Sequence, residues 1–290
     1  MSYAYIANKP TLLEYLKQET TKGSINLMID SGAFTKLNSK AAMSHVNVDD
    51  YCTFLKQYAQ YSEKYVMLDV IGNTPQSIAN YQKMLSKGLN PMYVVTFADN
   101  DWRMINEAVD RQSDICVAGG AIKQKCDWNI KRYQDVFFNT NKKARMHGLG
   151  FFTFPKMLQC HLASIDASTW KTAPASFGQG VYFDGKQTYR IAAMDIFAHK
   201  RTFPKPVLEL FKEYGVSAKQ YADKNNHSKS ANIEAYMTTV CAIKMQKYCK
   251  RHGLDYFLAC GCLEDVKTLV YVNENIHNMT YERYLHYVNS

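Results

Sequence analysis

The sequence has no run of about 18 consecutive apolar residues, so we expect no helix that crosses a membrane. Its first residues, MSYAYIANKP, lack the basic and then apolar segments of a secretory signal peptide. Neither a glycine-rich dinucleotide fingerprint nor a phosphate-binding loop is present, and there is no internal repeat. These absences predict a soluble protein of the cytoplasm that uses no redox cofactor.

Apolar residues, in contrast, are abundant. They make up 47% of the 290 residues, which is enough for a sizeable core and excludes disorder as the main state. The length fits one large domain or a domain with an appendage. Eight cysteines are present, and in a reducing cytoplasm we expect them to be thiols or metal ligands rather than disulfides.

The net charge of +9 is unevenly distributed along the chain. Residues 1–110 carry 10 Lys and Arg against 11 Asp and Glu, a net charge of −1, so residues 111–290 carry +10. Basic residues interleaved with aromatic ones are typical of proteins that bind a phosphate backbone, although a solvated surface is the competing interpretation. The candidate phosphate contacts are Lys142, Lys143, Arg145, Lys200 and Arg201.

Short apolar runs alternate with helical patterns through much of the chain. A strand followed by a helix, repeated, predicts parallel βαβ units. About eight such strands favour the α/β fold class and a (β/α)8 TIM barrel, with a doubly wound open sheet as the alternative. The expected strands are 25–29, 65–68, 92–97, 115–118, 146–149 and 162–165, with weaker candidates at 181–183 and 190–192.

The pattern becomes mainly helical from residue 203 onward. Helices are predicted at 204–215, 218–224, 230–252 and 281–288, with a further apolar run at 256–260. We therefore expect two domains, a barrel over residues 1–202 and a helical C-terminal region over 203–290 that packs on it.

Polar residues follow the predicted strands at the points where these strands end. Asp30, Asp69 and Asp166 each come directly after an apolar run, and glycine-rich turns occupy equivalent positions at 119–120 and 147–150. In a parallel barrel these ends meet at one mouth, where an aspartate is too costly to bury without a partner or a task. Each aspartate taken alone could instead cap the helix that follows it.

Several of these motifs, taken together, resemble those of a known family. DSGAF at 30–34, LD at 68–69, AGG at 118–120, HGLG at 147–150 and SID at 164–166 resemble the tRNA-guanine transglycosylase superfamily. The chain is most similar to its DNA branch, the 7-deazaguanine DNA transglycosylases of phages and bacteria, over residues 25–185. The resemblance implies a TIM-barrel pentosyltransferase that exchanges guanine in nucleic acid for a 7-deazaguanine base such as preQ0. If a phage encodes the chain, its compartment is the host cytoplasm.

The resemblance also implies roles for particular residues. Asp166 would be the nucleophile that forms a covalent aspartyl-glycosyl intermediate, and Asp30 the general acid and base. Asp69 would accept hydrogen bonds from the edge of the purine. The other expected substrate-binding residues are Ser31, Gly32, Phe34, Gly119, Gly120, His147 and Gly148, and for Phe34 core packing is an equal alternative.

The chain departs from the tRNA enzymes of this superfamily at two places. Those enzymes bind zinc through three closely spaced cysteines and a histidine, but here no third cysteine closely follows Cys262. We therefore expect no metal, and a zinc site made of Cys241, Cys249, Cys260 and Cys262 is the alternative. Residues 167–170, Ala-Ser-Thr-Trp, replace the Pro-Thr-Arg segment with which those enzymes recognise tRNA, which favours DNA as the substrate.

A DNA substrate makes a physical demand, because its target guanine must be flipped out of the duplex or lie in a single strand. We expect Trp170 and residues 176–180 to contact the sugar-phosphate near that nucleotide, and an ordinary connecting loop is the competing interpretation. A tRNA-guanine transglycosylase, a glycosidase that releases guanine, and a barrel that binds guanine or nucleic acid without catalysis are the open functional alternatives. A homodimer is also left open.

Overall fold

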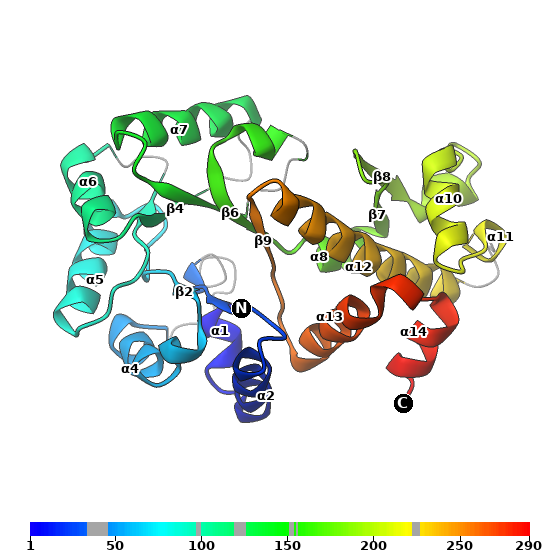
Figure 1. Ribbon diagram of the computed structural model, residues 1–290, viewed down its shortest axis with the longest axis horizontal. Helices are drawn as coiled ribbons and strands as arrows, with labels where there is room; N and C mark the ends of the chain where they lie inside the picture. The colour runs from blue at the N-terminus through cyan, green and yellow to red at the C-terminus, as the bar shows by residue number, and fades with distance from the viewer. Residues whose placement is uncertain (34–45, 97–99, 119–125, 151–153, 155, 222–226) are drawn as a thin grey trace. The chain divides into compact units, whose positions relative to one another are not determined.

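The structure, a computed structural model, describes residues 1–33, 46–96, 100–118, 126–150, 154, 156–221 and 227–290 (Figure 1). The chain forms two compact units. The first contains Met1–Asp166 and Ala259–Asp265, and the second contains Ala167–Leu258 and Val266–Ser290. The units divide the chain near residue 166, and the domain boundary expected at 202/203 stays a prediction.

The first unit alternates strands and helices. Its strands form parallel pairs. β1 pairs with β2, and in a second sheet β3, β4, β5 and β6 lie side by side in that order. The strands are β1 Met28–Ile29, β2 Lys64–Tyr65, β3 Val94–Val95, β4 Asp114–Ala118, β5 Arg145–Leu149 and β6 Leu162–Ala167. The helices are α1 Tyr3–Ile6, α2 Pro10–Thr21, α4 Val48–Tyr58, η1 Ala59–Tyr61, α5 Thr74–Ser86, α6 Trp102–Arg111, α7 Cys126–Asn139 and η2 Lys156–Gln159.

The order of the strands distinguishes between the two folds that the sequence allows. A parallel bridge joins Val66, just after β2, to Met92, just before β3, so that the series runs from β1 to β6 without a reversal. A doubly wound sheet would reverse its strand order at a switch point. The described residues therefore form a mixed α/β unit with a parallel sheet in sequential order, and the strands within them do not close into a barrel.

Side-chain caps begin the helices that connect these strands. The side chains of Asn47, Asn73 and Asp101 accept hydrogen bonds from backbone N–H groups in the first turns of α4, α5 and α6. These bonds satisfy donors that have no partner within the helix, which is why asparagine and aspartate are favoured at this position. The start of each of these three helices is therefore fixed by a capping side chain that can be recognised in the sequence.

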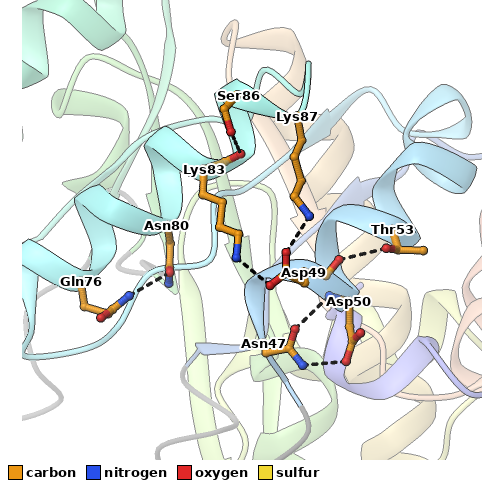
Figure 2. Close-up of polar contacts among 9 residues, drawn as sticks. All are labelled: Asn47, Asp49, Asp50, Thr53, Gln76, Asn80, Lys83, Ser86 and Lys87. Atoms are coloured by element: carbon orange, nitrogen blue, oxygen red, sulfur yellow. Dashed lines mark hydrogen bonds and ion pairs between the residues drawn. The ribbon is translucent and has the colours of Figure 1, made fainter.

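An ion-pair cluster joins α4 to α5 on the surface of the first unit (Figure 2). The carboxylate of Asp49, in the first turn of α4, lies 2.6 Å from Nζ of Lys83 and 2.6 Å from Nζ of Lys87. The hydrogen bonds from these two lysines lower the pKa of Asp49 to about 2. This cluster fixes the spacing of two neighbouring crossover helices, although exposed ion pairs contribute little to stability.

Most strands of the first unit are buried, although β2 is only half-buried. Ile29, Val95, Ile115 and Val117 are fully buried in β1, β3 and β4, whereas β5 and β6 also bury the polar side chains of His147 and Ser164. Continuous apolar strands are expected where helices or barrel contents cover both faces of a parallel sheet. The core of the unit therefore lies along the strands, and polar side chains collect at their ends.

The second unit is mainly helical and contains one antiparallel hairpin. Its strands are β7 Gln179–Phe183, β8 Thr188–Ala192 and β9 Asp255–Leu258. Its helices are α8 Thr169–Phe177, α9 Ala193–Phe197, α10 Lys205–Glu213, α11 Ala218–Tyr221, α12 His227–Arg251, most of α13 Leu263–Asn275, η3 Ile276–Asn278 and α14 Tyr281–Val288. The long helix α12 packs against α8 and β7.

Two expectations fail in this unit. Strands β7 and β8 were expected as further parallel strands of a barrel, but they pair with each other in antiparallel register, Val181 opposite Arg190. The connecting loop that was the competing interpretation of residues 176–180 is also not what the structure shows: residues up to Phe177 belong to α8, which contains Pro174 and has Gly178, with φ of 54°, as its C-cap, and Gln179 begins β7. The left-handed conformation at Gly178 ends the helix and turns the chain into β7. Among the described helices, none is long and apolar enough to cross a membrane.

Candidate active site

Asp30 directly follows β1, in a turn that requires glycine at position 32. Its Oδ2 accepts a hydrogen bond of 3.1 Å from the N–H of Gly32, which has φ of 86°. A Cβ at Gly32 would lie 2.6 Å from Cβ of Ala4 and 2.7 Å from Oγ of Ser2. The sequence Asp-Ser-Gly therefore builds a tight turn that holds the Asp30 carboxylate at the strand end.

Asp69 is held in place from helix α5. The carbonyl of Leu68 accepts a 2.9 Å hydrogen bond from the Asn80 side chain, and the N–H of Val70 donates to Oγ of Ser77 at 2.8 Å. Both neighbours of Asp69 are thus fixed by polar side chains that are themselves buried. The hydroxyl of the fully buried Ser31 lies 3.4 Å from Oδ1 of Asp69 and links the ends of β1 and β2.

Asp166 lies in β6 beside two donors from the neighbouring strand. Its Oδ1 accepts a 2.7 Å hydrogen bond from the N–H of Gly150, and Nε2 of His147 lies 3.2 Å from the same oxygen. The ring of His147 is buried, and its Nδ1 lies 2.8 Å from Oγ of Ser164. His147 and Ser164 lie opposite each other in the parallel register of β5 and β6.

The surroundings shift the pKa values of the two expected catalytic carboxyls in opposite directions. Burial raises the pKa of Asp30, and the negative charge of Asp166 raises it further. Burial acts in the same direction on Asp166, but the hydrogen bond and the charge of His147, with the N–H of Gly150, outweigh it and lower the pKa. Such a split leaves one carboxyl ready to give a proton and the other ready to attack as an anion.

The three aspartates are close enough to influence one another and a shared neighbour. Burial and the charge of Asp30 raise the pKa of Asp69 to about 6. Burial raises the pKa of Cys116 well above its ordinary value, and the charges of Asp30, Asp166 and Asp69 all add to the effect. Cys116 lies in β4 opposite His147. Asp30 and Asp69, which follow β1 and β2, therefore lie near Asp166 of β6 and near Cys116 in the middle of β4.

Not all of the expected substrate-binding residues can be placed. Phe34, Gly119 and Gly120 lie outside the described residues. Ser31, Gly32 and His147 lie at the carboxylate cluster, in the contacts given above. Gly148 is buried in β5, opposite Val117 of β4 and Ile165 of β6.

Three of the candidate phosphate contacts lie at the opposite edge of the sheet from the carboxylates. Lys142 and Lys143 precede β5, and Arg145 begins it, whereas the carboxylates lie where the strands end. Lys143 pairs with Asp110 at 2.9 Å, and Arg145 pairs with Asp114 at 3.2 Å. All three cations are exposed, two of them are ion-paired, and an interface at the carboxylate edge does not include them.

The other candidate nucleic-acid contacts belong to the second unit. Lys200 and Arg201 are exposed, and the guanidinium of Arg201 donates a 3.0 Å hydrogen bond to the carbonyl of Arg190. Trp170 is 6% exposed and packs inside this unit, which leaves its ring little surface for a nucleic acid. The two exposed cations therefore fit the expected contact better than the tryptophan does.

Three of the four cysteines of the alternative zinc site are buried. Burial raises the pKa of Cys241 to about 12 and of Cys249 to about 11, which favours neutral thiols over metal-binding thiolates. Cys260 is also buried, and Cys262 is half-buried. Within the described residues, no group of three or more His, Cys, Asp or Glu side chains is arranged to hold a metal ion.

Several residues of the site were not singled out from the sequence. Ser164, Gly150 and Cys116 surround Asp166 and His147, and Ser77 and Asn80 fix the chain beside Asp69. The signal for Ser77 and Asn80 was present, because two polar residues three positions apart on the buried face of a helix need partners. Ser164 carried a weaker signal, since it precedes Asp166 by two positions and so shares its face of the strand.

Comparison with known proteins adds nothing to this geometry. No protein-family model matches the chain, and no curated protein and no solved structure matches it. The functional conclusion therefore depends on the motifs of the sequence and on the chemistry of the carboxylate cluster.

Proposed function

We propose that the chain is a DNA-guanine transglycosylase, which replaces guanine in DNA with a 7-deazaguanine base. The observation that carries this proposal is the opposite shift in the pKa values of Asp30 and Asp166. An exchange at an N-glycosidic bond needs an anionic nucleophile and a proton donor on one reacting centre. A barrel that only binds a base has no need for this pairing.

The first half of the reaction breaks the bond to guanine. A carboxylate oxygen of Asp166 attacks C1′ of the target nucleotide, and the C1′–N9 bond breaks as the new C1′–O bond forms. Asp30, whose raised pKa favours the protonated form, gives its proton to the departing guanine. The remaining charge of Asp166 stabilises the oxocarbenium character of the sugar, and the product is an aspartyl-glycosyl ester and a free guanine.

The second half reverses these roles. Asp30, now a carboxylate, takes the N9 proton from the incoming base, and N9 attacks C1′. The ester bond breaks, and Asp166 leaves as a carboxylate. One N-glycosidic bond replaces another, so the exchange is close to energy-neutral and requires no nucleoside triphosphate.

Asp69 is proposed to select the base. Its pKa of about 6 means that it is ionised at neutral pH, when it can accept hydrogen bonds from the N1–H and the 2-amino group of guanine. The buried Ser31 holds one of its oxygens and leaves the other for the base. An adenine-like base presents no pair of donors at these positions and would leave the carboxylate without partners.

The proposal includes a TIM-type barrel for the catalytic part of the chain. The sequential parallel order of β1 to β6 supports it, because consecutive strands are neighbours in a barrel and the catalytic groups collect at the carboxyl ends. DNA is the proposed partner because the segment after Asp166 lacks the tRNA-recognition residues and the cysteines do not form the zinc motif. The target guanine is flipped out or single-stranded.

The test is incubation of the full chain with guanine-containing DNA and, separately, with tRNA, each with radiolabelled preQ0. Label in DNA but not in tRNA supports the proposal, and label in tRNA alone overturns the choice of substrate. Release of guanine without incorporation of label would show a glycosidase instead. Asp166→Asn is the matched variant, because it keeps the shape of the side chain and removes the nucleophile, and it should neither incorporate label nor form a DNA adduct.

A further inference from the structure

Ser164 and His147 form a buried polar pair beneath Asp166. Each is 1% exposed, and Oγ of Ser164 lies 2.8 Å from Nδ1 of His147. The two residues are register partners in β6 and β5, so the contact is built into the pairing of the strands. Burying two polar side chains is unfavourable unless they satisfy each other, and an apolar pair would fill the same space without that requirement.

The other ring nitrogen faces the carboxylate. Nε2 of His147 lies 3.2 Å from Oδ1 of Asp166, whose lowered pKa keeps it ionised and therefore an acceptor only. Nε2 donates to this oxygen only in the tautomer that carries its proton on Nε2, and in a neutral ring of that form Nδ1 is an acceptor. Nδ1 needs a donor in that state, and the Ser164 hydroxyl is placed to supply it.

A serine suits both charge states of the ring. Its hydroxyl donates to Nδ1 when the imidazole is neutral, and it can accept from Nδ1–H when the ring is protonated. Nε2 keeps its proton in either state, so the hydrogen bond to Asp166 persists. A side chain at position 164 that only donates or only accepts would satisfy one of the two states.

The hydrogen bonds to Asp166 also distinguish its two oxygens. Within the described residues, both bonds to this carboxylate, from His147 and from the N–H of Gly150, end on Oδ1. Two donors on one oxygen fix the plane of the carboxylate and reduce the nucleophilicity of that oxygen. The second oxygen, Oδ2, is left for the sugar.

We propose that Ser164 is a positioning residue, which holds the proton of His147 on Nε2 so that His147 and Gly150 bind Oδ1 of Asp166 and Oδ2 attacks C1′. The placement of the proton follows from the contacts of His147 and the ionised state of Asp166, whereas the choice of attacking oxygen rests on the proposed transglycosylase function. The two parts can therefore be tested separately.

The position of the proton is read by NMR, without any substrate. The full chain is labelled with ¹⁵N-histidine, and long-range ¹H–¹⁵N spectra are recorded at pH 8, with the His147 signals identified by their loss in His147→Gln. We expect the Nε2–H tautomer in the wild type and a mixture of tautomers in Ser164→Ala. An Nδ1–H tautomer in the wild type, or an unchanged spectrum in Ser164→Ala, overturns the proposal.

The kinetic consequence is measured in single-turnover formation of the DNA adduct. Ser164→Ala should slow it about tenfold, because the variant loses one hydrogen bond of the series that runs from Ser164 through His147 to the charged Asp166. The KM for DNA should not change. Ser164→Thr keeps the hydroxyl and should restore most of the rate. Thr140→Val is the matched control, because it removes another fully buried hydroxyl of the same unit, and its rate should equal that of the wild type.

The outcomes separate this inference from the proposed function. If the wild type transfers no base to any nucleic acid, the proposed function fails and the NMR result alone decides the role of Ser164. If the wild type is active and Ser164→Ala is as fast, or Ser164→Thr is as slow as Ser164→Ala, the positioning role is wrong.

Discussion

Nε2 of His147 lies 3.2 Å from Oδ1 of Asp166, although the two residues are 19 positions apart in the chain. They meet because β5 and β6 are neighbours in the parallel sheet, with His147 opposite Ser164, two residues before Asp166. This contact is the main reason why Asp166 has a lowered pKa in surroundings whose burial would otherwise raise it. The proposed nucleophile is therefore kept ionised by a neighbouring strand.

Replacing His147 should move the acidic limb of the pH–rate profile. The nucleophile must be ionised, so the rate falls as the pH drops below the pKa of Asp166. His147→Ala removes the hydrogen bond and the charge that lower this pKa, so it rises and the limb moves to higher pH. The measurement is kcat/KM for base exchange from pH 4 to 9, a range that begins above the limb of the wild type and in which the limb of His147→Ala should appear. His147→Gln, which retains an N–H donor, should shift the limb less, and an unshifted limb in His147→Ala would contradict this role.

Replacing Asp30 should be rescued by a leaving group that needs no proton. Burial and the charge of Asp166 raise the pKa of Asp30, which suits it to protonate the departing guanine. Asp30→Asn should therefore stop adduct formation with ordinary DNA. DNA that contains 7-methylguanine carries a cationic base, which leaves without protonation, and Asp30→Asn should form the adduct with it at a rate near that of the wild type. Asp166→Asn is the control and should fail with both substrates.

Replacing Asp69 should stabilise the fold and abolish base binding. Its pKa is raised from 3.8 to about 6, so ionising it in the folded protein costs up to about 3 kcal/mol, reduced by whatever solvent reaches the group. This cost is complete above pH 6 and disappears as the pH falls through 6 toward 3.8. Asp69→Asn should thus raise the free energy of unfolding by roughly 1–2 kcal/mol at pH 8 and by little at pH 4.

The measurement for Asp69 is urea unfolding at the two pH values, with isothermal titration of preQ0. For the wild type, the affinity for the base should fall as the pH drops below about 6, because the protonated carboxyl loses acceptor capacity. A destabilised Asp69→Asn at pH 8, or one that binds preQ0 as the wild type does, would show that Asp69 has a different role.

The basic residues should divide into two groups in their effect on DNA binding. The triple variant Lys142→Gln, Lys143→Gln, Arg145→Gln should leave the salt dependence of DNA affinity unchanged, because these cations lie at the amino edge of the sheet and two of them are ion-paired. The double variant Lys200→Gln, Arg201→Gln should reduce the slope of log affinity against log salt concentration by about one to two. Fluorescence anisotropy with labelled DNA at several salt concentrations measures both slopes. A lower slope in the triple variant alone would reverse the assignment.

The local elements of the first unit could be predicted from the sequence to a large extent. Each of the six expected strands between residues 25 and 165 overlaps a strand of the structure, and the final helix, Tyr281–Val288, has the expected bounds. Continuous apolar runs and capping residues are local signals, and they act before any long-range contact forms. Helix α2, Pro10–Thr21, was not predicted, although Pro10 at its start is a helix-initiating signal.

Which strands pair with each other was harder to predict from the sequence. The runs at 181–183 and 190–192 were read as strands, correctly, but an apolar run does not specify its partner, and the structure pairs them with each other in antiparallel register. Helix α8 contains Pro174. Proline removes one backbone donor and disfavours a helix interior, but tertiary packing overrides this preference here.

The sequence by itself determined which groups could do chemistry. Asp30, Asp69, Asp166 and His147 follow or occupy apolar strands, and their side chains are costly to place there without a partner or a task. Only the tertiary structure decided how they act on one another. Which carboxyl is ionised depends on burial and on donors from neighbouring strands, and the register of β5 and β6 alone brings Ser164, His147 and Asp166 into contact. Hydrogen bonds and charges act through space over a few ångströms, a distance that separation along the chain does not reveal.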